Sequence, residues 1–172
     1  MLKTDKYVYK KIKGKSTLLV LIHGASCDYT FWSNINRYYF NRGFSTLAIN
    51  LPGHGNCKLK PLNKIEKMSE YVSNLVKKLR HKDIVICGHS MGSLICLDLA
   101  SKKLLNIKKM ILIGTAYPML VSNHLLKDSK INPSKAVNSM IKWGLAPDNI
   151  LGGNNNLGFY LPNLLCTLMN NN

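Results

Sequence analysis

The fold of this chain is decided by the stretch IVICGHSMG at residues 84–92, in which an apolar run leads directly into a glycine-flanked serine. A short apolar run bounded by glycine is typical of a buried strand. The residues that follow, 93–105, carry apolar side chains at the spacing of a helix. The stretch therefore predicts a sharp turn from strand to helix with Ser90 at its apex.

A serine at such a turn has the placement that a nucleophile needs, because the turn lifts its hydroxyl out of the backbone. Gly88 and Gly92 fit the turn because larger side chains there would collide across it. The amide of Met91 falls in the first turn of the helix, where N–H groups lack partners and negative charge is favoured. We predict that Ser90 is a nucleophile and that Met91 N–H stabilises an oxyanion. The alternative is a chance pentapeptide.

A second strand signal lies upstream, where STLLVLI at residues 16–22 ends abruptly at His23 and Gly24. Acyl transfer needs two hydrogen-bond donors around the developing oxyanion, and a loop beside the serine turn can supply one. We predict Ala25 N–H as this second donor.

A third strand signal, at residues 44–49, is closed by the turn sequence NLPGHG. Helix-patterned segments at 28–42, 65–80 and 93–105 separate the strands, each long enough for a crossover. Alternating strands and helices predict an α/β fold, a doubly wound and mostly parallel sheet with helices on both faces.

These three junctions, in this order, resemble the α/β-hydrolase superfamily over roughly residues 6–172. The resemblance implies an N-terminal core at residues 1–118 and a partial helical cap at 119–172. It also implies that His23, Gly24 and His89 support the loops around the nucleophile, and that the reaction needs neither a metal nor a cofactor.

Within that superfamily, an aspartate at the turn would indicate a dehalogenase or an epoxide hydrolase, and Ser90 disfavours both. Acyl transfer to water remains, as in carboxylesterases, lactonases, thioesterases, lipase-like enzymes and carbon–carbon bond hydrolases, and we expect a small-molecule ester as the substrate. The fold and the serine turn do not separate these activities. A cofactor-free peroxidase or lyase and a noncatalytic binding module are the alternatives from other classes.

Two residues depart from the pattern that the resemblance implies. Asn50 stands where an aspartate commonly precedes the Leu-Pro-Gly-His-Gly turn, and Cys57 stands where a serine often follows it. Both positions organise loops, so we expect altered hydrogen bonding near the site.

The resemblance also implies a catalytic acid and then a histidine after the nucleophile. Asp98 lies along the nucleophile helix and points away from the turn. His124 precedes Asp128 and Asp148, which would require a rearranged order. We expect that the chain is a fragment, or else a natural short form, and that it is strongly impaired because it lacks a base.

The balance of 24 basic and 8 acidic residues gives a net charge of +16. Lysines concentrate only between Lys3 and Lys15 and are otherwise scattered, without a nucleic-acid-binding module. We therefore expect no nucleic-acid partner and attribute the excess mainly to an AT-rich genome. An acidic carrier protein, steered to a basic rim around the pocket, is the open alternative.

The remaining features predict an ordinary intracellular enzyme. No apolar run is long enough to cross a bilayer, and nothing reads as a signal peptide, so we expect a cytoplasmic protein without a membrane span. The 5 cysteines form no C-x-x-C pair and are expected to be free thiols. Phe31 and Trp32 are expected to pack the first crossover helix on the sheet.

Overall fold

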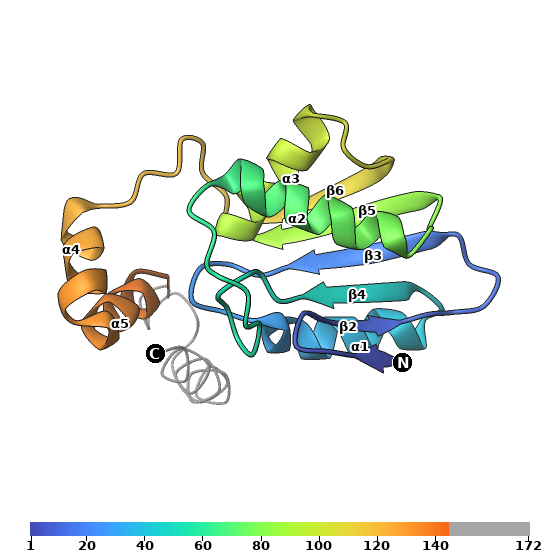
Figure 1. Ribbon diagram of the computed structural model, residues 1–172, viewed down its shortest axis with the longest axis horizontal. Coiled ribbons are helices and arrows are strands. Elements are labelled where there is room, and N and C mark those ends of the chain that lie inside the picture. Colours follow the sequence, from blue (N-terminus) through green and yellow to red (C-terminus); the bar gives the residue numbers. More distant parts are fainter. Residues whose placement is uncertain (145–172) are drawn as a thin grey trace, which may run out of the picture. The chain divides into compact units, whose positions relative to one another are not determined.

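The computed structural model describes residues 1–144 and divides the chain into two compact units (Figure 1). The first unit is Met1–Ala116, and the second begins at Tyr117. Much of the cap expected at 119–172 lies outside the described residues, so the assignment of the second unit as a cap stays a prediction.

The first unit is built on a six-stranded sheet with the order β1-β2-β4-β3-β5-β6 (Figure 1). Strands β4, β3, β5 and β6 are parallel to one another. The α/β class and the mostly parallel sheet predicted from the sequence are therefore confirmed. The strands are β1 (Leu2–Lys3), β2 (Tyr7–Lys10), β3 (Thr17–Ile22), β4 (Ser45–Ile49), β5 (Asp83–His89) and β6 (Ile107–Ile113).

An antiparallel hairpin of β1 and β2, which was not predicted from the sequence, extends one side of the sheet. β2 pairs with β4 so that Tyr7 lies opposite Ile49. The lysines of this segment hide the strand signal, because only Tyr9 of β2 is buried. The hairpin turn lies at the edge of the sheet where β4 ends.

Crossover helices connect the parallel strands and cover both faces of the sheet (Figure 1). The short helix η1 (Tyr29–Trp32) and α1 (Ser33–Asn41) lie on one face, and α2 (Ile65–Lys78) and α3 (Met91–Ser101) pack together on the other. The second unit contains α4 (Asn123–Ile131) and α5 (Pro133–Gly144). Among the described residues, no helix is long and apolar enough to cross a membrane.

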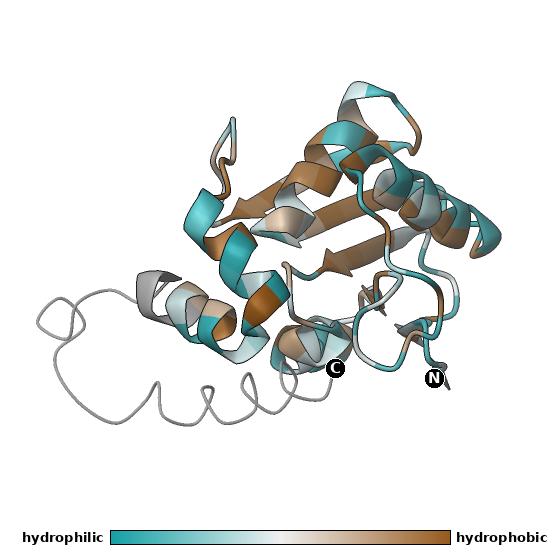
Figure 2. Ribbon diagram, turned by 60° about the vertical axis from the view of Figure 1, so that its left-hand side comes forward, coloured by the Kyte–Doolittle hydropathy of each residue, from teal (hydrophilic) through white to brown (hydrophobic). Residues whose placement is uncertain are grey.

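Successive residues of a strand point to opposite faces of the sheet, so a strand that is apolar along its length buries side chains on both faces. Figure 2 shows apolar strands and helices that carry hydrophilic residues as well. In β3, Leu18, Val20 and Ile22 pack under α2 and α3. Leu19 and Leu21 point to the opposite face, toward Trp32 and α1. Both faces of the central strands are therefore buried.

β6 is an edge strand in the described part of the chain, because its only strand partner there is β5. Met110, Ile111 and Ile113 are exposed. It begins at Ile107 and includes Lys108 and Lys109, because an exposed edge strand tolerates charged side chains.

Candidate active site

Ser90 occupies the junction between β5, which ends at His89, and α3, which begins at Met91. Its backbone has φ 52° and ψ −120°, an unusual conformation for a residue with a side chain. The amide of Ser90 donates to the carbonyl of Ile113 at 2.8 Å. The side chain is partly exposed. Ser90 therefore stands at a strained turn that is held by a neighbouring strand.

Close backbone contacts explain the glycines on either side of Ser90. A Cβ on Gly92 would overlap the carbonyl of Ile22 and lie 2.6 Å from the carbonyl oxygen of His23. A Cβ on Gly88 would overlap the carbonyl of Gly92 and lie 2.7 Å from Cys96 Sγ. The start of α3 can approach β3 and β5 this closely only without these side chains.

The loop after β3 lies directly beside the serine turn. A Cβ on Gly24 would lie 3.1 Å from the Cβ of Ser90 and 3.0 Å from Nδ1 of His89. Ala25 follows in this loop and is partly exposed, and Ser26 has a positive φ of 57°. The structure thus brings the predicted residues of two loops, far apart in sequence, to one edge of the sheet.

His23 links this loop to the one after β4. Its Nδ1–H donates to the carbonyl of Gly24 at 2.7 Å, and its Nε2 accepts from the amide of Leu51 at 3.2 Å. The ring is fully buried, and burial lowers its pKa to about 3. His23 is therefore a neutral structural group with both nitrogens engaged.

Asn50, which was expected to alter the hydrogen bonding near the site, joins three segments there. Its Nδ2 donates to the carbonyl of Asp5 at 2.8 Å, and its Oδ1 accepts from the amide of Tyr29 at 2.8 Å. The backbone amide of Asn50 donates to the carbonyl of Lys6. An aspartate has no N–H to give Asp5, so the amide side chain suits the β1–β2 turn that lies here.

Phe31 differs from the expectation that it packs on the sheet. Trp32 is buried against β3, but Phe31 is 41% exposed and stacks on the ring of His89, with centroids 4.7 Å apart and an interplanar angle of 24°. Burial lowers the pKa of His89. An aromatic pair therefore flanks the residue that precedes Ser90.

His54 is also held in a loop beside His23. Its Nδ1 donates to the carbonyl of Pro52 at 3.1 Å, and the two imidazole rings lie 5.1 Å apart. Burial lowers the pKa of His54, although Asp28 acts in the opposite direction. In the first unit, no histidine forms an ion pair with a carboxylate.

Asp98 is engaged away from Ser90, in the contact between α2 and α3. Its carboxylate accepts from the hydroxyl of Ser69 at 2.6 Å and forms an ion pair with Lys102 at 3.0 Å. This carboxylate stabilises helix packing.

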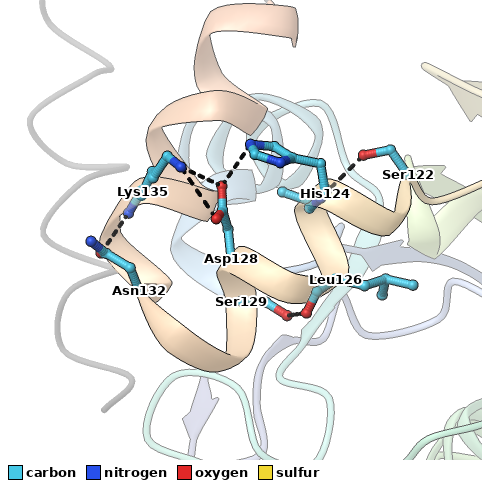
Figure 3. A network of polar contacts seen from close by, with 8 residues as sticks. Ser122, His124, Leu126, Asp128, Ser129, Asn132 and Lys135 are labelled. Carbon is cyan, nitrogen blue, oxygen red and sulfur yellow. Dashed lines mark hydrogen bonds and ion pairs between the residues drawn. The ribbon is translucent and has the colours of Figure 1, made fainter.

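His124 and Asp128 pair with each other within the second unit (Figure 3). Nε2 of His124 lies 3.1 Å from Oδ2 of Asp128, and Nζ of Lys135 lies 3.3 Å from the same oxygen. The spacing of four residues on α4 places the pair on one side of the helix. Asp148, the other acid considered, lies outside the described residues.

Comparison with known proteins places these features in a family context. The model of a family described as alpha/beta hydrolase fold matches residues 17–171. A pimeloyl-[acyl-carrier protein] methyl ester esterase from Nitrosospira multiformis is 31% identical, with the alignment covering 63% of this chain and 42% of the relative. A putative esterase/lipase 2 from Mycoplasma pneumoniae is 25% identical over 65% of this chain and 41% of the relative. The matches span about two fifths of these relatives.

Solved structures share the fold at low identity. A hydrolase from Pseudomonas aeruginosa aligns with a TM-score of 0.73 and 18% identity, covering 95% of this chain and 62% of that one. Est816, described as an N-acyl homoserine lactone degrading enzyme, aligns with a TM-score of 0.75 and 16% identity, covering 95% and 61%.

Proposed function

Because the chain belongs to the alpha/beta hydrolase fold family, we propose that it is a serine hydrolase that cleaves a carboxylic ester or a related acyl bond. The observation that carries the proposal is the backbone of Ser90, held at φ 52° between β5 and α3. A turn of this kind presents a hydroxyl at the end of a parallel strand, where ligands bind in open α/β sheets.

In the proposed reaction, Ser90 Oγ attacks the carbonyl carbon while its proton passes to a base. The amides of Ala25 and Met91 donate to the resulting oxyanion. The tetrahedral intermediate expels the alcohol and leaves an acyl group on Ser90, which water then removes. Support comes from the closeness of Gly24 to Ser90 and from the position of Met91 at the first residue of α3.

The first unit offers no evident base for this reaction. His23 and His54 have lowered pKa values and hydrogen bonds to backbone carbonyls. His81 bonds to the hydroxyl of Tyr9 and the carbonyl of Ser16, and His89 stacks on Phe31. We propose that residues 1–172 alone do not turn over an ester at a useful rate.

The test is chemical rescue with imidazole, which can replace a missing general base. Residues 1–172 and Ser90→Ala should hydrolyse p-nitrophenyl acetate equally in buffer. Added imidazole should then raise the rate of the chain containing Ser90 above that of Ser90→Ala, which measures catalysis by imidazole itself. Equal rates at every imidazole concentration would contradict the nucleophilic role, and Ser90-dependent turnover without imidazole would contradict the missing base.

A methyl ester on an acidic carrier protein is the second substrate candidate, favoured by two relatives of 31% and 32% identity that bear that description. Exposed lysines at positions 3, 58 and 60 lie in segments that reach the nucleophile edge of the sheet. In the rescue assay, hydrolysis of a carrier-bound ester should fall steeply with salt, whereas hydrolysis of p-nitrophenyl acetate should not. Equal salt dependence would remove the carrier from consideration.

We also place the protein in the cytoplasm. The described cysteines, Cys27, Cys57, Cys87 and Cys96, are all free and buried, which fits a reducing compartment.

A further inference from the structure

Basic side chains that are scattered in sequence are gathered by the topology at one edge of the sheet. This is the edge where β3, β5 and β6 begin. The amide of Asp83 donates to the carbonyl of Ser16, and Nδ2 of Asn106 donates to the carbonyl of Lys82. The segments that lead into the three strands are therefore neighbours.

We call this region the basic edge and define it by the exposed lysines and arginine of four segments. These are residues 11–15 before β3, 77–82 between α2 and β5, 102–103 after α3, and 108–109 in β6. The carboxylates among or beside them are Asp83 and Asp98, which are paired with Lys108 and Lys102. The charge here is strongly positive.

The opposite edge, which carries Ser90, has mixed charge. Asp5, Asp28, Glu66 and Glu70 occur there in the hairpin turn, the loop after β3 and the first half of α2, among several lysines. The expectation that lysines beyond the N-terminal segment are merely dispersed is therefore wrong for the first unit. Genome composition can raise the number of lysines, but it does not place them on one edge.

Helix dipoles explain only part of this arrangement. Lys77 and Lys78 lie in the last turn of α2 and Lys102 follows the end of α3, positions where a cation stabilises the helix. Lys15, Lys82 and Lys109 belong to loops and a strand, so no helix end accounts for them.

We propose that the basic edge docks on the surface of an anionic phospholipid bilayer. An open hollow of about 640 Å³ lies within it, lined by Lys103, Lys108 and Lys109 beside Leu104, Leu105 and Met110. Leu104 and Leu105 are half-buried and Met110 is exposed, and apolar side chains beside lysines match a bilayer interface, where acyl chains lie below negative headgroups. Clusters of lysines gain attraction to such a surface without any fixed geometry.

The same observations fit nucleic acid less well. Helices α2 and α3 reach the basic edge with their C-terminal ends, so they offer carbonyls and not N–H groups to a phosphate. Two aromatic rings near this edge are already engaged in cation–π contacts. The guanidinium of Arg42 lies 3.6 Å from the ring centroid of Tyr38, and Nζ of Lys10 lies 5.2 Å from that of Phe40. Base stacking would have to displace them.

Docking by this edge would turn Ser90 away from the membrane, because the strands that begin at the basic edge end at the serine turn. The substrate would then arrive from the aqueous side. The inference does not depend on the proposed function, and Ser90→Ala should bind vesicles as the parent chain does.

The experiment measures vesicle co-sedimentation of residues 1–172 with phosphatidylcholine alone and with phosphatidylcholine containing about 30% phosphatidylglycerol. The test variant carries Lys15→Glu, Lys103→Glu and Lys109→Glu. The matched control carries Lys58→Glu, Lys60→Glu and Lys64→Glu, which are exposed residues between the end of β4 and α2 and change the net charge equally. Circular dichroism verifies that both variants are folded.

We expect binding only to the anionic vesicles, release by salt, and a loss of about a hundredfold in partitioning for the test variant. The control variant should lose less than about fivefold in partitioning, which is the contribution expected of a single lysine near the membrane surface. Equal losses in the two variants would overturn the proposal, as would equal binding to neutral vesicles. A preference for duplex DNA or RNA over anionic vesicles at the same salt would also overturn it.

Discussion

Replacing Asn50 by aspartate tests whether the amide side chain is what joins the segments around the site. Asn50 is fully buried, and its Nδ2 supplies a hydrogen bond of 2.8 Å to the carbonyl of Asp5. In Asn50→Asp, a carboxylate faces that carbonyl, so a hydrogen bond is lost and a charge is buried without a cation. Loss of the donor alone costs about 1–3 kcal/mol, and the buried charge adds to it. We expect a total loss of about 3 kcal/mol in the free energy of unfolding at pH 7.

The stability of Asn50→Asp relative to the parent chain should depend on pH in a defined direction. Burial in Asn50→Asp raises the pKa of the new carboxyl above its unfolded value, because the charged form is disfavoured. The folded variant therefore binds a proton that the unfolded chain does not, and the destabilisation relative to the parent shrinks as the pH falls toward 4. The gap should narrow by up to about 1.4 kcal/mol per pH unit in that window.

Urea unfolding followed by circular dichroism, at several pH values, measures this difference directly. Asn106→Asp is the matched control, because Nδ2 of Asn106 makes the same kind of bond, 2.9 Å to the carbonyl of Lys82, on an exposed residue. Asn106→Asp should lower the free energy of unfolding by less than about 1 kcal/mol. An Asn50→Asp variant as stable as the control variant, or one with the same loss of stability at pH 7 and pH 4.5, would refute the proposed role of the amide.

Three other substitutions test the site at separate points. Gly92→Ala should destabilise the protein by about 2–3 kcal/mol although alanine has the better helix propensity, because the new methyl group overlaps the carbonyl of Ile22. Urea unfolding measures the change, and a more stable variant would contradict the close contact between α3 and β3. The pKa of His23 is about 3 in the folded chain, below its unfolded value of 6.5. Below pH 6.5 the unfolded chain therefore binds a proton at His23 that the folded chain does not bind, and the free energy of unfolding falls in acid. His23→Gln should reduce that fall by about 1.4 kcal/mol per pH unit between pH 6 and 4, and parallel pH profiles would refute the buried neutral ring. Phe31→Ala should raise the pKa of His89 toward its ordinary value by exposing the ring, as measured by NMR titration, and an unchanged pKa would show that Phe31 does not shield it.

The fold was predictable where burial imposes a pattern on the sequence. The buried strands β3, β4 and β5 are apolar runs that stop at glycine or proline, so their positions could be predicted within one or two residues. β2 was not predicted because it lies near one side of the sheet and buries only Tyr9, so its sequence lacks the apolar run of a central strand. The start of β6 gives a weak sequence signal for a related reason, since an exposed strand tolerates lysines such as Lys108 and Lys109.

The geometry of the site was predictable where the ends of apolar strands mark it, as at the serine turn and at the loop after β3. The serine turn was the clearer signal, since its glycines, its strand and its helix are contiguous in sequence. The role of Asn50 depends on Asp5 and Tyr29, which are distant in sequence, and that of Phe31 depends on His89. The basic edge is invisible in the sequence for the same reason, because only the sheet order places lysines from separate segments together.

The hydrogen bond from the amide of Ser90 to the carbonyl of Ile113 has a mechanical consequence. Ile113 is the last residue of β6, so the unusual backbone of the serine is fastened to a strand that, in the described part of the chain, pairs with β5 alone. Peripheral strands open at lower free energy than central ones. Fraying of β6 would therefore release Ser90 from its positive-φ conformation while β3, β4 and β5 stay intact, so the serine turn would be lost before the first unit unfolds.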